Sequence, residues 1–146
     1  MNISRPLLDE LIAHAREDVP NECCGIVAVE RVESVGAADD NSAPVRATRV
    51  HRAVNTAASP LKFEVDGIEL LGLIDAIERD GHELGAIYHS HTRTAPRPSQ
   101  TDINFAANWP GVEWIIVGLA DRDAPPEVRS YLIEDGQVRE VMLERE

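Results

Sequence analysis

The sequence has no long hydrophobic run that could cross a membrane. A helix needs about 20 consecutive apolar residues to span a bilayer, and no stretch approaches that length. The first ten residues, MNISRPLLDE, contain neither the basic start nor the apolar stretch of a secretory signal. These absences favour a cytoplasmic protein.

Positive charge is also scarce. The chain has 14 Lys and Arg residues against 26 Asp and Glu residues, which gives a formal net charge of −12. A surface this acidic repels phosphate backbones and anionic lipid headgroups. We therefore expect neither a nucleic acid nor a membrane as a partner. The sequence leaves the oligomeric state open, a homo-oligomer included.

The chain has only two cysteines, Cys23 and Cys24, and they are adjacent. A disulfide between neighbours would close almost no loop and would be strained. We therefore expect free thiols in a reducing compartment. A buried structural role is more typical of such residues than a role at a metal, although the sequence does not decide their function.

The length of 146 residues and the 43% hydrophobic fraction fit one domain, residues 1–146, with one core. The spacing of apolar residues predicts helices near 4–18, 70–81 and 99–109. It also predicts strands at 25–32, 45–54, 84–89, 113–119, 128–133 and 137–143, with a short extended piece at 62–65. Residues 34–44 form a predicted polar loop. This order favours an α/β sandwich with one central sheet and few helices.

Two histidines, His89 and His91, are two residues apart at the end of a predicted strand. Side chains at such positions leave the same face, so both imidazoles can reach one ion. Asp102 follows a Pro-rich loop, in the first turn of the next predicted helix, where the chain can bring its carboxylate back to the histidines. Two imidazoles and one carboxylate suit zinc, and they leave a fourth position open, as in catalytic sites.

Ser99 precedes Asp102 by three residues and shares its helical face. Its hydroxyl could donate to an oxyanion beside the metal. Alternatively, Ser99 caps the helix and Asp102 completes a capping box, a role we expect to exclude metal binding by that carboxylate. Two histidines two residues apart are also common at strand ends without a metal. The full spacing H-x-H-x7-S-x-x-D, however, is specific.

This pattern resembles the JAMM motif of the MPN+ domain metalloproteases, and the resemblance extends over most of the chain. Residues 54–63, VNTAASPLKF, also resemble bacterial members. The resemblance implies an α/β sandwich around a mixed, curved, partly barrel-like sheet with about three helices. One departure is Thr92, which stands where many members have proline.

The resemblance implies a role for each site residue. It implies that His89, His91 and Asp102 bind Zn²⁺ and that Ser99 stabilises the tetrahedral intermediate. Glu22, in PNECCG, matches the family's upstream glutamate, which activates water as a general base. On its own, an acidic residue after a helix is usually just solvated, so the assignment of Glu22 rests on the resemblance.

The short bacterial members that this chain resembles cleave an amide bond after the C-terminal Gly-Gly of a ubiquitin-like sulfur-carrier protein and release an amino acid such as cysteine. We therefore expect a zinc metallopeptidase (a hydrolase) with that substrate. Two alternatives stay open: a zinc peptidase acting on small peptides or other C-terminal adducts, and a non-catalytic zinc-binding interaction module. The sequence names neither the carrier nor the released residue.

The remaining histidines and the tryptophans belong to no motif. We expect His14, His51 and His82 at the surface or at helix ends, and Trp109 and Trp114 in the core.

Overall fold

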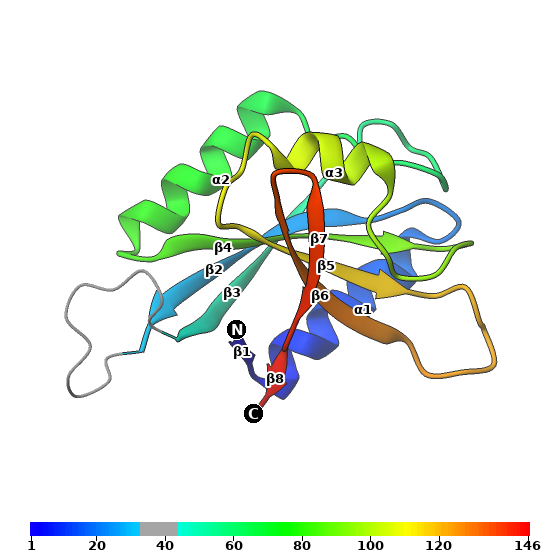
Figure 1. Ribbon diagram of the computed structural model, residues 1–146, viewed down its shortest axis with the longest axis horizontal. Coiled ribbons are helices and arrows are strands. Elements are labelled where there is room, and N and C mark those ends of the chain that lie inside the picture. The colour runs from blue at the N-terminus through cyan, green and yellow to red at the C-terminus, as the bar shows by residue number, and fades with distance from the viewer. Residues whose placement is uncertain (33–43) are drawn as a thin grey trace.

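The computed structural model describes residues 1–32 and 44–146, so the predicted polar loop lies almost wholly outside the described residues. Within them, one curled sheet carries α1 on one face and α2 and α3 on the other (Figure 1). No described helix is long and apolar enough to cross a membrane. The helices are α1 (Arg5–Asp18), α2 (Gly67–Arg79) and α3 (Gln100–Ala106). The strands are β1 (Asn2–Ile3), β2 (Cys24–Arg31), β3 (Val45–Ala53), β4 (Glu83–His91), β5 (Glu113–Gly118), β6 (Glu127–Glu134), β7 (Gln137–Val141) and β8 (Glu144–Arg145).

The described strands form a mixed sheet in the order β7-β6-β5-β4-β2-β3-β1-β8. The pairs β4–β5, β1–β3 and β1–β8 are parallel, and the other neighbouring pairs are antiparallel. Figure 1 shows how strongly β6 and β7 turn away from the direction of β2 and β3. The predicted fold, a mixed and curved sheet with about three helices, is confirmed.

Helices cover both faces of the central strand β5. Trp114 and Ile116 belong to the core under α2 and α3, whereas Ile115 and Val117 belong to the core under α1. Successive side chains of a strand point to opposite faces, so a strand covered on both sides is apolar at every position. This explains why the sequence shows no alternation here. The ends of β4 and β5 therefore lie between two packed apolar cores.

Helix α3 is shorter than predicted, because it ends at Ala106 and not at Trp109. The amides of Asn108 and Trp109 donate to carbonyls three residues earlier, so the last turn tightens. Pro110 disfavours the helical conformation in the residue before it, which ends the helix early.

The β6–β7 hairpin forms as predicted, with positive φ at both Asp135 and Gly136. The short strands β1 and β8 were not predicted, because two residues carry no recognisable period. Residues 62–65 belong to no strand and line the site described below.

The prediction for His14 is wrong. This residue is 5% exposed, and its Nδ1 lies 2.6 Å from the Tyr88 hydroxyl. Burial lowers the pKa of His14. It follows Leu11 by three residues and therefore lies on the buried stripe of α1.

Three other side-chain predictions hold. Cys23 and Cys24 are free and fully buried. Trp114 is in the core, and Trp109 is partly buried against the same cluster. His51 and His82 are partly exposed.

Candidate metal centre

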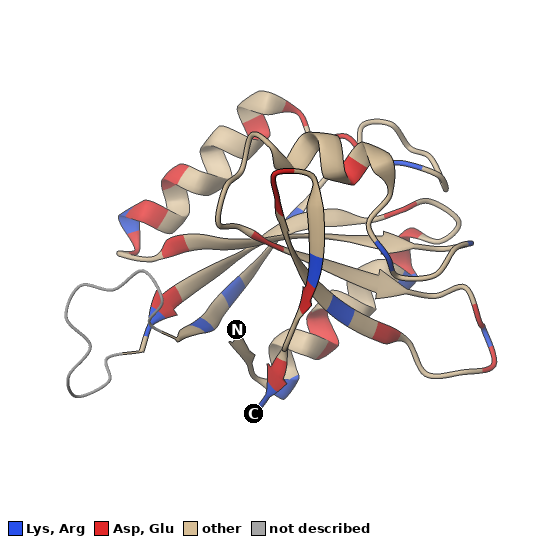
Figure 2. Cartoon of the chain, viewed as in Figure 1, with Lys and Arg blue, Asp and Glu red and all other residues tan. Residues whose placement is uncertain are grey.

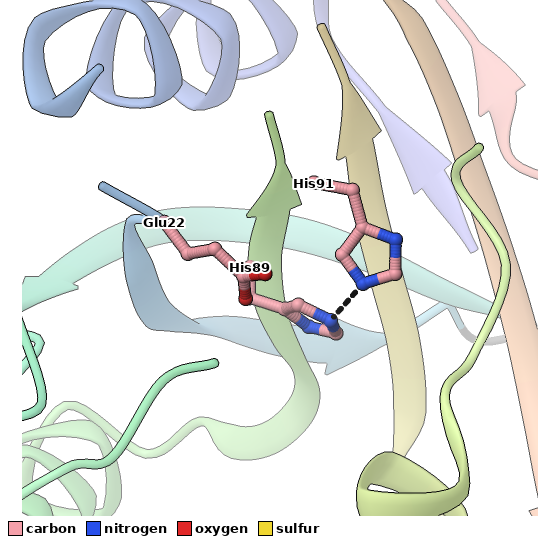
Figure 3. Close-up of side chains that lie close together, drawn as sticks. All are labelled: Glu22, His89 and His91. Atoms are coloured by element: carbon pink, nitrogen blue, oxygen red, sulfur yellow. Dashed lines mark hydrogen bonds between the residues drawn. The ribbon is translucent and has the colours of Figure 1, made fainter. Parts of the chain in front are cut away.

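Glu22, His89 and His91 come together where β2 begins and β4 ends. The antiparallel register pairs Cys24 with His89, so the same register continued by two residues sets Glu22 opposite His91. All three side chains then leave the same face of the sheet. One possible ligand atom from each residue lies within 4.8 Å of the others (Figure 3).

The opposite face of these strand ends is locked by close packing. A Cβ atom on Gly25 would lie 2.4 Å from the Tyr88 ring and 2.4 Å from the His51 carbonyl oxygen. Only glycine therefore fits beside Tyr88. The Ser90 hydroxyl accepts a hydrogen bond from the Cys23 amide at 2.8 Å, which satisfies a buried donor. The strand ends that hold the histidines are thereby fixed.

Asp102 reaches the histidines from the first turn of α3. The two Nε2 atoms of His89 and His91 are 3.1 Å apart. The Oδ2 atom of Asp102 is 3.2 Å from the first and 3.9 Å from the second. Ligands about 2.0–2.1 Å from a tetrahedral zinc ion are roughly 3.3 Å from one another. The structure thus brings the three predicted ligands together at a suitable spacing.

The orientation of the His91 imidazole also suits a metal. His91 Nδ1 lies 2.8 Å from the carbonyl oxygen of Ala95, so this nitrogen donates and leaves the Nε2 lone pair facing the cluster. Burial and the neighbouring His89 lower the pKa of His91, which keeps the ring neutral, as a metal ligand must be. The His89 ring stacks on Phe63, with centroids 4.5 Å apart, and meets the edge of Trp114.

Asp102 is buried but ionised. Burial alone would raise the pKa of this carboxyl, but its contacts with His89, the Ser99 amide and His91 outweigh burial and hold the pKa below its usual range. A buried carboxylate facing two imidazole nitrogens carries the charge and the lone pairs that a dication needs.

Ser99 and Asp102 form the capping box that we considered as an alternative. The Ser99 hydroxyl accepts from the Asp102 amide at 3.2 Å, and Asp102 Oδ2 accepts from the Ser99 amide at 2.9 Å. Capping does not keep this carboxylate away from the histidines, because the same Oδ2 lies 3.2 Å from His89 Nε2. A carboxylate oxygen has lone pairs for both contacts. The Ser99 hydroxyl accepts in this pair, so its own proton is still free to donate.

Glu22 is 5% exposed, and its backbone is held on both sides. Its amide donates to the Ser59 carbonyl at 2.9 Å, and its carbonyl accepts from the Asn55 side chain at 2.9 Å. Burial, with the charge of Asp102 adding to it, raises the pKa of Glu22 to about 8. Such a carboxyl exchanges its proton near neutral pH, as a general acid–base group requires.

Asn55 holds the backbone beside Glu22 in place, and the sequence alone did not predict this role. Its side-chain amide donates to the carbonyls of Glu22 and Lys62, and its side-chain oxygen accepts from the amides of Ala57 and Glu64. Four hydrogen bonds use its full capacity. No local pattern marks such a residue, although it lies in the stretch 54–63 that resembles bacterial relatives.

A cleft of about 550 Å³ opens beside the cluster. It is lined by Glu22, His91, Ser99 and Asp102, by the segment 60–65, and by Thr56, Thr94, Thr101 and Phe105. The cleft therefore brings the candidate catalytic groups together with mainly apolar walls.

Comparison with known proteins gives the family. The model for prokaryotic homologues of the JAB domain matches residues 4–134. The chain belongs to this family. A JAB1/MPN domain protein from Archaeoglobus fulgidus has the same fold, with a TM-score of 0.57 and 22% identity over 99% of this chain and 98% of that one. The solution structure of a Desulfitobacterium hafniense protein is more similar, with a TM-score of 0.82 and 28% identity over 99% of this chain and 92% of that one.

Among the curated relatives, one is named a peptidase and another a desampylase. The CysO-cysteine peptidase of Mycobacterium tuberculosis is 33% identical over 94% of this chain and 86% of its own length. The desampylase of Haloferax volcanii is 33% identical over 80% of this chain and 78% of its own length. These relatives place the chain among the JAMM-type peptidases, which are hydrolases.

Proposed function

We propose that the chain is a zinc-dependent peptidase in which His89, His91 and Asp102 hold the metal. The observation that carries this proposal is the convergence of two Nε2 atoms and one carboxylate oxygen, 3.1, 3.2 and 3.9 Å apart, with His91 oriented by the Ala95 carbonyl. Bound there, zinc supplies a Lewis acid for a carbonyl oxygen and lowers the pKa of a water that it holds to about 7.

Glu22 serves as the proton carrier. Its carboxylate takes a proton from the attacking water and returns it to the leaving amine as the amide C–N bond breaks. The water oxygen stays with the acyl group as a new carboxylate. A raised pKa and a buried position support this role. One carboxylate oxygen of Glu22 lies within 4.8 Å of one nitrogen of each imidazole, so it is close enough to reach a water held beside them.

Ser99 assists at the carbonyl oxygen. The hydroxyl proton is not used in the capping box, because the Ser99 oxygen accepts from the Asp102 amide there. It is therefore free to donate to the oxygen on which negative charge develops. The capping box fixes the hydroxyl in position before the substrate binds, which lowers the cost of ordering it.

The substrate is a ubiquitin-like sulfur-carrier protein that ends in Gly-Gly and carries an amino acid, such as cysteine, in amide linkage. The name of the mycobacterial relative supports this class. Two glycines lack β-carbons, so such a tail enters the cleft beside the candidate metal ligands at least steric cost. Contacts with the folded carrier, remote from the bond, would supply most of the binding energy.

Intact-mass spectrometry tests the proposal. A carrier–Gly-Gly–Cys adduct incubated with the zinc-loaded protein should lose one cysteine residue, and it should stay intact with metal-free protein. A short peptide with the same Gly-Gly-Cys end should be cut far more slowly. Equal kcat/KM on adduct and peptide would reject carrier recognition, and an uncut adduct would reject the peptidase proposal itself.

A further inference from the structure

A second hollow, of about 380 Å³, lies on the other side of the chain that follows His91. His91 and Thr94 line the cleft, whereas the intervening Thr92 and Arg93 line this hollow. The Thr92 hydroxyl donates to the Pro20 carbonyl at 3.1 Å and lies 3.4 Å from the Pro60 carbonyl. Thr92 therefore ties together the walls of both spaces, which a proline at this position could not do, because it has no hydroxyl.

Three arginines from three different elements line the hollow, which we call the arginine pocket: Arg16 from the last turn of α1, Arg93 from the loop after β4, and Arg122 from the loop after β5. Figure 2 shows basic positions on both loops at this end of the sheet. The pocket also contains one carboxylate, Asp121. Its four charged side chains thus sum to +2 in a protein of net charge −12.

None of these three arginines forms an ion pair with any residue in the described ranges 1–32 and 44–146. Six other arginines do pair with carboxylates there: Arg5, Arg31, Arg46, Arg52, Arg79 and Arg129. Guanidinium groups that share a pocket without pairing with its one carboxylate, Asp121, suit an anionic ligand, and their planar donors match a carboxylate best. Val19 and Leu119 add an apolar wall.

The arginine pocket lies next to the segments that carry Glu22 and His91. Pro20 precedes Glu22 by two residues, and Arg93 follows His91 by two, a separation of at most about 7 Å along the chain. The amide of Leu119 donates to the His91 carbonyl at 2.9 Å. A substrate whose acyl tail occupies the apolar cleft would therefore place its leaving group toward the arginines.

We propose that the arginine pocket binds the α-carboxylate of the amino acid that leaves, so that the protein prefers a single C-terminal amino acid to an isopeptide-linked lysine. This inference rests on the proposed function. In a leaving amino acid the carboxylate carbon is only about 2.5 Å from the scissile nitrogen. In an isopeptide the leaving lysine side chain has no negative charge near that nitrogen.

Two matched substrates test the proposal: carrier–Gly-Gly–Cys, and the same carrier ending in cysteinamide, which lacks the carboxylate. We expect the wild type to prefer the first by about 10–100-fold in kcat/KM, the usual value of a charge-assisted contact. Arg93→Gln combined with Arg122→Gln should lose most of this preference while keeping the rate on the cysteinamide. Arg139→Gln combined with Arg145→Gln, an equal charge change at exposed positions of β7 and β8, should keep the preference.

The outcomes separate the two proposals. Equal rates of the wild type on both substrates, or a preference that survives in the double variant, would overturn the carboxylate pocket while leaving the peptidase intact. If neither substrate is cut, the proposed function is wrong. A binding measurement with a free amino acid then tests the arginine pocket on its own. In metal-free protein, S-methyl-L-cysteine should shift the NMR signals of the Arg16, Arg93 and Arg122 side chains, whereas its carboxamide should not. No shift with either compound would reject the pocket.

Discussion

The side-chain amide of Asn55 donates to the backbone carbonyl of Glu22 at 2.9 Å. Its three other hydrogen bonds hold backbone groups of Ala57, Lys62 and Glu64 in and beside the wall of the cleft. One residue therefore fixes both the position of Glu22 and this wall. We expect Asn55→Ala to lower the free energy of unfolding by about 2–4 kcal/mol, because buried partners lose their bonds. It should also lower kcat with little loss of zinc. Urea unfolding and steady-state rates check this.

Asn108→Ala is the matched control, because Asn108 is exposed in the turn after α3. This substitution should leave the free energy of unfolding and kcat nearly unchanged. Stability and turnover of Asn55→Ala equal to those of the control would show that the hydrogen bonds of Asn55 do not position the site.

Metal content tests the ligand set. The purified protein should hold about one zinc ion per chain, because three ligands and an open position are in place. Each of His89→Ala, His91→Ala and Asp102→Ala should lose most of it, whereas the partly exposed His82→Ala should not. Full zinc occupancy in any of the three ligand variants, measured by elemental analysis, would remove that residue from the site.

Ser99 has two proposed roles, and two substitutions separate them. Ser99→Ala removes the cap and the hydroxyl, so it should cost about 1 kcal/mol of stability and on the order of 10²–10³ in turnover. Ser99→Gly keeps most of the capping preference, so its stability should fall by only a few tenths of a kcal/mol, with the same loss of turnover. Normal turnover in both variants would leave Ser99 a helix cap alone.

The raised pKa of Glu22 predicts how the stability of the metal-free protein depends on pH. The folded protein keeps this proton up to about pH 8, whereas the unfolded chain loses it near pH 4.5. Unfolding therefore releases a proton between these values, and the contribution of Glu22 to the free energy of unfolding falls as pH rises from about 4.5 to 8. A glutamine side chain at this position cannot ionise, so it removes this dependence.

We therefore expect metal-free Glu22→Gln to be more stable than the wild type at pH 8, with a smaller difference at pH 5. Urea unfolding of both proteins at the two pH values measures this. A difference that does not widen with pH would mean that Glu22 is not desolvated in the folded protein.

The sequence predicts those parts of the site that depend on local geometry. His89 and His91 share a face because a strand has period two, and the capping pair of Ser99 and Asp102 follows from helical spacing. Glu22 differs, because it reaches the histidines through the pairing of β2 with β4, which lie far apart in the sequence. Only the resemblance to a family pointed to it.

Long-range contacts also explain why the sequence did not predict the burial of His14, the role of Asn55 or the arginine pocket. The partner of His14 is Tyr88, 74 residues away, although the helical stripe through Leu11 already marked His14 as buried. Asn55 works through four backbone groups, which leave no signature in side-chain identity. The arginine pocket is assembled from a helix end and two loops, so no stretch of sequence shows that its charges meet.

We propose that zinc lies on His89, His91 and Asp102 while Glu22 moves the proton. The most direct test measures zinc content and turnover together on Glu22→Gln, with the carrier–cysteine adduct as substrate. We predict unchanged zinc and a loss of turnover on the order of 10²–10⁴, because an amide cannot carry the proton. Loss of zinc would make Glu22 a ligand, and wild-type turnover with full zinc would contradict its role as the base.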